Sequence, residues 1–247
     1  MYARETHSRA PSRECRISLD SLARSIAIDG PTAAGKSVVG RAIAEQLDIG
    51  FFDTGLMYRA CTLAVLRNAV DPNNQEAVST LVRSLELDMR WTNPTSPHIF
   101  LADDDVTTEL RSPEIEEAVS LISRIAEVRD ELVRRQRAIA SREPVVMAGR
   151  DIGTRVLTDA STKIFLDASS ETRARRRLGE EIDSGRDSSF ESVLTATRRR
   201  DELDDSGKRA LRREQAATGA IIVDTDALGV DQVVAACLEA YHDANES

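Results

Sequence analysis

Aromatic residues, cysteines and long apolar runs are all scarce in this chain, and each scarcity excludes a class of protein. Aromatic residues make up 4% of the 247 residues, which favours an aliphatic, helix-rich core. The three cysteines are scattered and in no metal-binding spacing, so we interpret them as free thiols in a reducing compartment. No apolar run approaches the roughly 18 residues of a membrane span. The polar residues 1–24 contain no hydrophobic signal core, so we expect a cytoplasmic protein with no membrane partner.

The excess of acidic residues makes nonspecific binding to polyanions unfavourable. The net charge is −9, from 42 Asp and Glu against 33 Lys and Arg. A chain with this charge repels nucleic acid and anionic membranes, so we expect no nucleic-acid partner. Any anionic substrate must then be captured where basic side chains gather locally.

Five short apolar runs alternate with predicted helices along most of the chain. Each run has the length and composition of a strand that is buried on both faces of a parallel sheet. The alternation predicts an α/β fold with a doubly wound, five-stranded parallel sheet. The predicted strands are 25–29, 49–53, 144–148, 163–167 and 220–224.

Residues 70–111 break this alternation. A predicted helix at 75–85 is followed by two apolar runs, 87–92 and 98–102, on either side of a loop that contains proline. Two strands joined by such a loop predict a small antiparallel insert. We therefore divide the chain into three parts. Residues 1–24 are predicted to be a disordered N-terminal extension, residues 25–69 and 112–247 form the core, and residues 70–111 form the insert.

A phosphate-binding loop is the clearest motif in the chain. The segment that matches G-x-x-x-x-G-K-[ST] at every fixed position is Gly30-Pro31-Thr32-Ala33-Ala34-Gly35-Lys36-Ser37. Glycine lets the backbone curl so that N–H groups face phosphate oxygens, and the helix that includes Val38 points its positive end at the same charge. Lys36 is expected to reach the β- and γ-phosphates of ATP, and the Ser37 hydroxyl to help hold Mg²⁺. The plain alternative is an ordinary glycine-rich turn.

This loop alone leaves kinase, GTPase and ATPase functions open. No N-K-x-D guanine motif is evident in the sequence. Arginines gather in several segments, however, and in an acidic protein such groups indicate that anions are bound at defined places. The plain alternative for each arginine is a solvated helix face or a salt bridge. The arginines that we single out are Arg59, Arg129, Arg150, Arg173, Arg175, Arg176, Arg177, Arg200 and Arg209.

Four motifs, in order and with similar spacing, closely resemble those of bacterial cytidylate kinases. They are Ile26-Ala27-Ile28-Asp29-Gly30-Pro31, Asp53-Thr54-Gly55-Leu56-Met57-Tyr58-Arg59, Gly149-Arg150-Asp151-Ile152-Gly153-Thr154 and Lys163-Ile164-Phe165-Leu166-Asp167-Ala168. The resemblance covers nearly everything from Ser25 to the C-terminus. It implies a P-loop nucleoside monophosphate kinase fold, in which the insert binds the acceptor and residues 173–206 approximately form a short lid over ATP. It also implies a monomer.

The resemblance implies a role for each matching residue near the sugar and phosphate of the acceptor. Arg59, Arg150 and Arg209 would hold phosphate, while Arg200 and Asp204 would contact the ribose. The sequence departs from the family pattern in this last region, because the segment after Arg200 lacks the usual Ala-Pro-Leu and its spacing slips. Two substitutes therefore remain open for these roles, Asp205 in place of Asp204 and Lys208 in place of Arg209. The resemblance also implies that Thr54 and Tyr58 lie beside the acceptor nucleotide.

The base would be recognised by three residues that match the cytosine-binding positions of the family, namely Ser120, Arg129 and Asp151. Cytosine presents an exocyclic amine where uracil presents a carbonyl. The Asp151 carboxylate can accept a hydrogen bond from the amine and would repel the carbonyl, while Arg129 can donate to the ring acceptors. The plain alternatives are a structural carboxylate linked to Arg150 for Asp151, and an ordinary helical serine for Ser120.

The hypothesis for function is ATP-dependent phosphorylation of CMP, with dCMP as a second acceptor, in pyrimidine nucleotide metabolism and with Mg²⁺ as the metal. A phosphate acceptor is already mostly a dianion at pH 7 and needs no general base. Catalysis then consists of positioning and charge neutralisation, with Lys36, Arg59 and Arg150 as the candidate catalytic residues. Two alternatives remain: a kinase of another small acceptor, such as UMP or a metabolite alcohol, and a regulatory nucleotide-binding module that has lost turnover.

Overall fold

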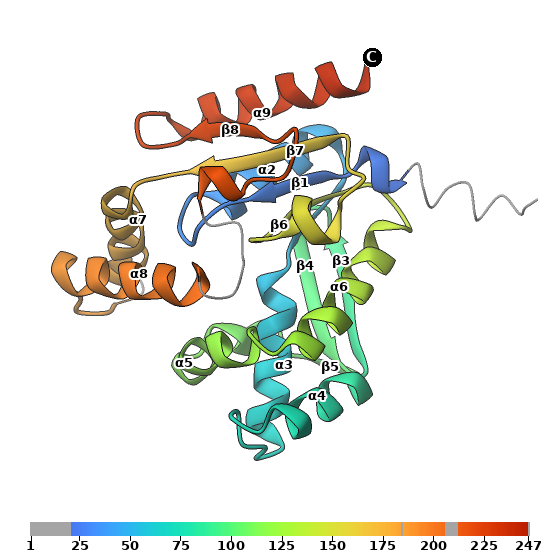
Figure 1. Ribbon diagram of the computed structural model, residues 1–247, viewed down its shortest axis with the longest axis vertical. Helices are drawn as coiled ribbons and strands as arrows, with labels where there is room; N and C mark the ends of the chain where they lie inside the picture. Colours follow the sequence, from blue (N-terminus) through green and yellow to red (C-terminus); the bar gives the residue numbers. More distant parts are fainter. Residues whose placement is uncertain (1–20, 184, 206–211, 247) are drawn as a thin grey trace, which may run out of the picture.

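The centre of the molecule is a sheet of five parallel strands in the order β2-β6-β1-β7-β8 (Figure 1). The computed structural model describes residues 21–183, 185–205 and 212–246, with the backbone alone at 203–205. Each strand coincides with one of the predicted apolar runs, so the predicted five-stranded, doubly wound α/β fold is confirmed. The strands are β1 (Ile26–Asp29), β2 (Gly50–Asp53), β6 (Val145–Ala148), β7 (Thr162–Asp167) and β8 (Ile221–Asp224).

Helices cover both faces of the sheet, and a separate apolar core lies on each. Successive side chains of a strand point to opposite faces. Ile26 and Ile28 therefore pack in one core with α2 (Lys36–Leu47) and α9 (Val230–Asn245). Ala27, between them, belongs to the other core, which also contains buried residues of α3 (Gly55–Arg67) and α6 (Ala126–Ala140).

The order of the strands places two loops side by side at one edge of the sheet. The chain leaves β1 toward β2 on one side and later returns past β1 to β7 and β8 on the other. In such sheets ligands bind beyond the carboxyl ends of the strands, where the direction of winding reverses. Here β1 ends at the phosphate-binding loop, and its neighbour β6 ends just before residues 149–151.

The insert forms a small antiparallel sheet, as its two predicted strands indicated. Trp91 Nε1 donates to the Phe51 carbonyl oxygen at 2.9 Å, and the Phe51 amide donates to the Pro94 carbonyl oxygen at 2.7 Å. The insert thus covers the outer edge of β2, which would otherwise expose unpaired backbone groups. Its elements are α4 (Gln75–Ser84), β3 (Leu87–Asn93), β4 (Ser96–Leu101) and the short β5 (Asp104–Asp105), which the sequence did not reveal.

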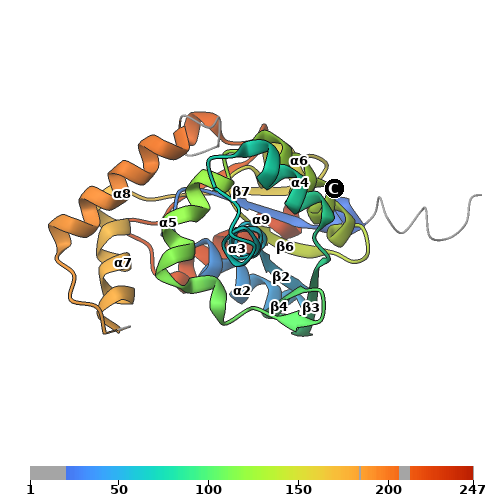
Figure 2. The same ribbon diagram turned by 90° about the horizontal axis from the view of Figure 1, so that it is seen from below.

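Three further helices stand beside the phosphate-binding loop. They are α5 (Pro113–Ile122), α7 (Ser170–Asp183) and α8 (Phe190–Asp205). The views of Figures 1 and 2 agree that α7 and α8 lie together on the side of α5 that faces away from the β3-β4-β5 sheet. The remaining short helices are η1 (Glu109–Arg111), η2 (Ile152–Val156) and η3 (Arg213–Gln215).

The boundary that we predicted for the disordered extension needs a correction. Residues 21–24 form a helical turn. Ser21 is buried, its carbonyl oxygen accepts from Ser25 Oγ at 2.8 Å, and Leu22 packs against the core. Residues 1–20 lie outside the described residues. Within the described part of the chain, none of the helices combines the length and the apolar composition that crossing a bilayer requires.

The contact between α2 and β2 leads to a stability prediction. A Cβ atom added at Gly40 would lie 2.4 Å from Phe51 Cε2 and 2.9 Å from its Cδ2, and the Phe51 ring is fully buried. We expect Gly40→Ala to lower the free energy of unfolding by about 1–3 kcal/mol, because the packed core cannot yield.

The matched control is Gly179→Ala in α7, where an added Cβ would meet no heavy atom within 4 Å. Alanine is favoured over glycine in a helix by about 0.5–1 kcal/mol, so this variant should gain stability. Urea denaturation of both variants measures the difference. Equal stabilities for Gly40→Ala and the wild type would contradict the prediction.

Candidate active site

The phosphate-binding loop folds tightly between β1 and α2. Gly30 has a φ of 147°, and a Cβ there would lie 2.3 Å from the carbonyl oxygen of Leu166 in β7. Gly35, just before the first residue of α2, has a φ of 96°. Both positions therefore require glycine, for close approach in the first case and for left-handed backbone in the second. The positive end of α2 faces into the loop, as phosphate binding requires.

Lys36 lies across this loop. Its Nζ donates to the carbonyl oxygens of Gly30 at 2.8 Å and Pro31 at 2.6 Å. Burial, followed in size by the nearby Arg150 guanidinium, lowers the pKa of the Lys36 ammonium to about 7. A phosphate bound beside Lys36 would raise that pKa again, because an anion favours the charged form of an amine.

Beneath the loop, Asp29 ties β1 to the turn after β6. Its side chain is almost wholly buried, with Oδ1 accepting from the Ile152 amide at 2.6 Å and Oδ2 from the Gly153 amide at 2.8 Å. Burial raises the pKa of Asp29 to about 6, and the two amide donors act in the opposite direction. The turn that Asp29 holds also carries Arg150 and Asp151, so the loop and the predicted acceptor residues share one support.

Ser37 and Asp53 form the oxygen pair that fits a magnesium ion. Ser37 Oγ donates to Asp53 Oδ2 at 2.9 Å, and Asp53 Oδ1 accepts from the Gly55 amide at 3.0 Å. Among the described residues, no group of three or more His, Cys, Asp or Glu could hold a metal by itself. Mg²⁺ does not need one, because it keeps several waters and is usually bound through one or two protein oxygens and substrate phosphates. Sequence reasoning chose Ser37 as the metal ligand and did not pair it with Asp53.

A cavity of about 210 Å³ beside the loop brings most of the predicted site residues together. Its walls come from the loop itself, from the ends of β2 and β6, and from α3, α5, α6 and α8. The convergence supports the predicted acceptor site, although the individual roles stay predictions. The predicted residues that line it are Thr32, Ala33, Lys36, Ser37, Thr54, Tyr58, Arg59, Arg129, Arg150, Asp151 and Arg200.

Two hydroxyl contacts join the acceptor cavity to the surrounding strands and loop. Thr54 is buried, and its Oγ1 donates to the Ala148 carbonyl oxygen at 3.0 Å. Its hydroxyl proton is therefore used within the protein, which leaves the oxygen as an acceptor. Arg150 Nη2 donates to Thr32 Oγ1 at 2.8 Å, so Arg150 contacts the phosphate-binding loop directly.

Arg129 and Asp151 form an ion pair in the wall of this cavity. Arg129 Nη2 donates to Asp151 Oδ2, and the two side chains are only 8% and 13% exposed. We considered Asp151 as a structural carboxylate linked to Arg150, but the structure pairs it with Arg129 instead. A charge pair with so little solvent orients both groups firmly, and removal of one partner leaves the other buried and uncompensated.

The structure does not place Ser120 in the acceptor cavity. Ser120 lines a neighbouring cavity of about 950 Å³ between α5 and α8, which it shares with Arg59 and Arg200. Ser123 lines the acceptor cavity instead and is 8% exposed. Residues three apart lie on the same side of a helix, so Ser123 follows Ser120 by about one turn at the end of α5. The spacing of three residues between Ser120 and Ser123 could have indicated Ser123 as a second candidate for contact with the base.

In two parts of the predicted site the side chains lie outside the described part of the structure. Asp204 and Asp205 belong to the last turn of α8, where the structure describes only the backbone. Lys208 and Arg209 lie outside the described residues. The ribose and phosphate roles of this segment remain predictions.

Another cavity, of about 490 Å³, surrounds the phosphate-binding loop on the α2 side. At one end it is apolar, with Val38, Leu228 and Val230 in its wall, and these side chains are 53%, 38% and 48% exposed. Arg176 lines it as well and donates to the Thr225 carbonyl oxygen at 2.7 Å. Sequence reasoning identified no lining for the nucleotide base of ATP, because these residues belong to no motif.

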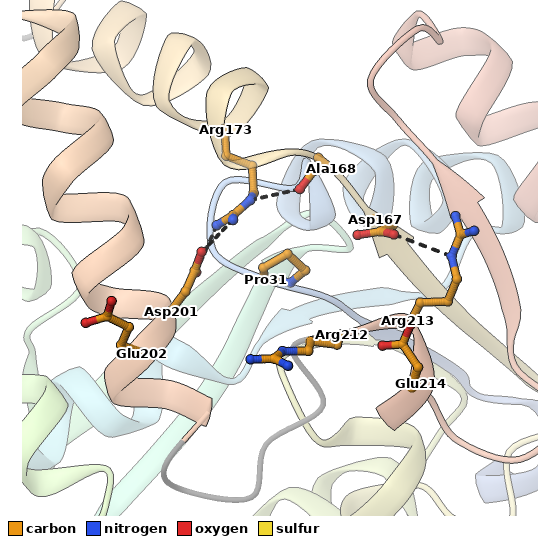
Figure 3. A pocket seen from close by; sticks show the side chains of 9 residues that line it. All are labelled: Pro31, Asp167, Ala168, Arg173, Asp201, Glu202, Arg212, Arg213 and Glu214. Atoms are coloured by element: carbon orange, nitrogen blue, oxygen red, sulfur yellow. Dashed lines mark hydrogen bonds and ion pairs between the residues drawn. The ribbon is translucent and has the colours of Figure 1, made fainter.

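Of the arginines in the cluster 173–177, Arg173 reaches the phosphate-binding loop. It is 5% exposed and donates to the carbonyl oxygens of Thr32 at 3.3 Å and Ala168 at 3.1 Å. It also binds both carboxylate oxygens of Asp201 in α8, at 3.0 and 2.6 Å. Arg173, Ala168 and Asp201 line a cavity of about 640 Å³. Figure 3 shows them there together with Pro31 and the Asp167–Arg213 ion pair. Arg173 thus fastens α7 and α8 to the loop.

Comparison with known proteins agrees with this geometry. The cytidylate kinase family model matches residues 26–243. The cytidylate kinase of Corynebacterium efficiens is 46% identical over 210 residues, which are 85% of this chain and 90% of that protein. The cytidylate kinase of Geobacillus kaustophilus is 44% identical over 87% of this chain and 95% of its own.

The similarity to a solved structure is much weaker. A gluconokinase from Sinorhizobium meliloti gives a TM-score of 0.41 at 19% identity, over 91% of this chain and 95% of that one, and supports no conclusion. The family model and the sequence relatives span almost all of the sheet, the phosphate-binding loop and the acceptor cavity. The resemblance inferred from four motifs is therefore confirmed, and this chain belongs to the cytidylate kinase family.

Proposed function

We propose that this protein transfers the terminal phosphoryl group of ATP to CMP, and to dCMP as a second acceptor, in pyrimidine nucleotide metabolism. The observation that carries the proposal is the acceptor cavity, which collects Arg59, Arg129, Arg150 and Asp151 beside Lys36 of the phosphate-binding loop in a member of the cytidylate kinase family. A kinase of UMP or of a metabolite alcohol and a regulatory module without turnover have no comparable support.

The reaction needs no general base. The phosphate of CMP is mostly a dianion at pH 7, because its second pKa is about 6, so its oxygen attacks without losing a proton. An alcohol kinase would need a carboxylate for that purpose. Two carboxylates line the cavity: Asp53, whose oxygens accept from Ser37 and the Gly55 amide, and Asp151, which is paired with Arg129.

The main barrier is the repulsion between two polyanions. One pair of unit charges 4 Å apart costs about 1 kcal/mol in water and about 4 kcal/mol at an effective dielectric constant of 20. Lys36, Arg59 and Arg150 line the same cavity and would supply positive charge around the space where the phosphates meet. Because these groups are fixed before the reaction begins, they stabilise the transferring phosphoryl without reorganisation.

Mg²⁺ and the adenine of ATP would occupy the α2 side of this arrangement. Ser37 and Asp53 would hold the ion with the phosphate oxygens, where the ion neutralises part of the charge on the transferring group. Val38, Leu228 and Val230 offer an apolar surface for the base. We further propose that the protein acts as a cytoplasmic monomer without membrane or nucleic-acid partners, and that residues 70–111 and 173–206 approximately act as the acceptor-binding subdomain and the lid.

The Arg129–Asp151 pair supports selection of cytosine. With Oδ2 bound to Arg129, the second carboxylate oxygen of Asp151 can accept from the exocyclic amine of the base. A uracil carbonyl in the same place would face a negative oxygen and leave it unpaired, which costs about 1–3 kcal/mol.

The substrate is tested with a coupled assay of ADP release across CMP, dCMP, UMP, AMP, GMP and small alcohols. We expect turnover with CMP and dCMP, and a specificity constant for UMP that is lower by about tenfold or more, from the unpaired groups described above. If another acceptor is turned over while CMP and dCMP give only background rates, the proposal is wrong.

Lys36→Ala distinguishes a kinase from a regulatory module. In a kinase it removes one preorganised charge at the transferring phosphoryl, so the turnover number should fall by about 100-fold or more. Urea denaturation should show an intact fold, since Lys36 bonds only to loop carbonyls. A wild-type protein that binds ATP but phosphorylates none of the acceptors would favour the regulatory module.

Asp151→Ala tests the role of the buried ion pair. We expect kcat/KM for CMP to fall by about 5- to 150-fold, which corresponds to about 1–3 kcal/mol of lost acceptor binding. The Kd for ATP, measured by calorimetry, should change by less than about twofold because neither Arg129 nor Asp151 lines the cavity on the α2 side of the loop.

The control is Asp130→Ala, which removes a 70% exposed carboxylate and its ion pair with Arg155 on the outside of the same helix, α6. An exposed pair contributes little, so both substrates should bind as in the wild type. Equal losses of CMP and ATP affinity in Asp151→Ala would mean that Asp151 is purely structural.

A further inference from the structure

Glu116 in α5 bridges two arginines that belong to different parts of the site. Its Oε1 lies 3.5 Å from Nη1 of Arg59 in α3, and its Oε2 accepts from Nη2 of Arg177 in α7 at 2.8 Å. The three side chains are 20%, 22% and 30% exposed in the order Arg59, Glu116 and Arg177. One carboxylate thus holds an arginine of the acceptor cavity with one oxygen and an arginine of the cluster 173–177 with the other.

The position of Glu116 relative to the cavities sets it apart from an ordinary surface ion pair. Glu116 and both arginines line the cavity around the phosphate-binding loop, and Arg59 extends from there into the acceptor cavity. Arg59 is held from the other side by the Leu110 carbonyl oxygen, which its Nη1 reaches at 3.1 Å. Glu116 therefore fixes the guanidinium at the boundary between the two cavities.

The same carboxylate anchors α7. Arg177 also contacts Glu180 at 3.3 Å and Glu181 at 3.2 Å, but both of these belong to its own helix. The Glu116 contact crosses from α7 to α5, and α5 packs on α3. A negative charge in a cavity that receives phosphates opposes phosphate binding, so its presence there needs another explanation.

We propose that Glu116 is a positioning residue that couples acceptor binding to the closure of α7 over ATP, by holding Arg59 and Arg177 at a fixed separation. The inference rests on the proposed function and deepens it. When the acceptor phosphate binds Arg59, the bridge transmits the position of Arg59 to α7, so that acceptor binding strengthens the hold of α7 over the triphosphate. The negative charge of Glu116 weakens ATP binding slightly and is kept for this coupling.

Glu116→Gln separates the effect of the negative charge on ATP binding from the effect of the bridge on coupling. The loss of a negative charge should leave the KM for ATP unchanged or lower it, while the loss of the bridge should lower kcat. The factor by which CMP tightens the binding of a non-hydrolysable ATP analogue, measured by calorimetry, should fall by about fivefold or more, since couplings between sites typically span 5- to 150-fold. A purely structural role would instead weaken both substrates and lower the midpoint of urea denaturation.

Glu116→Asp and Glu117→Gln complete the set. Aspartate keeps the charge but is one methylene shorter and cannot contact both arginines, so it should lower kcat and the coupling without lowering the KM for ATP. Glu117 is the exposed neighbour on α5, and its variant carries the same charge change as Glu116→Gln. It should behave as the wild type. In an Arg177→Gln background, Glu116→Gln should cause no further loss of coupling.

Hydrogen exchange of α7 provides a readout that does not depend on turnover. With CMP and the ATP analogue bound, the amides of residues 170–183 should exchange faster in Glu116→Gln than in the wild type and in Glu117→Gln. Unchanged coupling and unchanged exchange in Glu116→Gln would overturn the inference, as would equal effects from Glu117→Gln. Failure of the proposed function looks different, because the wild type itself would then lack turnover with CMP and dCMP.

Discussion

The site depends on the buried carboxylate of Asp29, which joins the strand of the phosphate-binding loop to the turn of the acceptor residues. Its two oxygens accept from consecutive amides of η2 at 2.6 and 2.8 Å. Without that contact, β1 and β6 would still pair, but the turn that carries Arg150 and Asp151 would lose its buried attachment to the strand of the loop. Because phosphoryl transfer relies on positioning, an error of about 1 Å between these groups would matter.

Charge compensation explains how an acidic protein concentrates arginines in one region. Most of the site arginines are held by carboxylates or backbone carbonyls: Arg129 by Asp151, Arg173 by Asp201 and Ala168, and Arg177 by Glu116 and two glutamates of α7. These partners keep like charges apart and orient each guanidinium. An incoming phosphate therefore meets guanidinium groups whose orientation is already set by these partners.

Two arginines of this network hold α7 and α8 to the rest of the site. Arg173 fastens the two helices to each other and to the Thr32 carbonyl oxygen, while Arg177 fastens α7 to α5. The Arg173 side chain is 5% exposed, whereas that of Arg177 is 30% exposed. A buried anchor near the first turn of α7, with a more accessible contact farther along, fits the closure of α7 that we propose.

The sequence by itself determined the strands, the phosphate-binding loop and the family. Runs such as Ile26–Asp29 are buried on both faces, and the glycines of the loop are required by its own backbone, so both features are local and legible in the chain. The tertiary structure decided which side chains meet. Asp151 pairs with Arg129 rather than Arg150, Ser123 rather than Ser120 faces the acceptor cavity, and Glu116 bridges α3 and α7. Such pairings join residues that are distant in sequence, and the direction in which a side chain points depends on how helices pack, which local spacing does not encode.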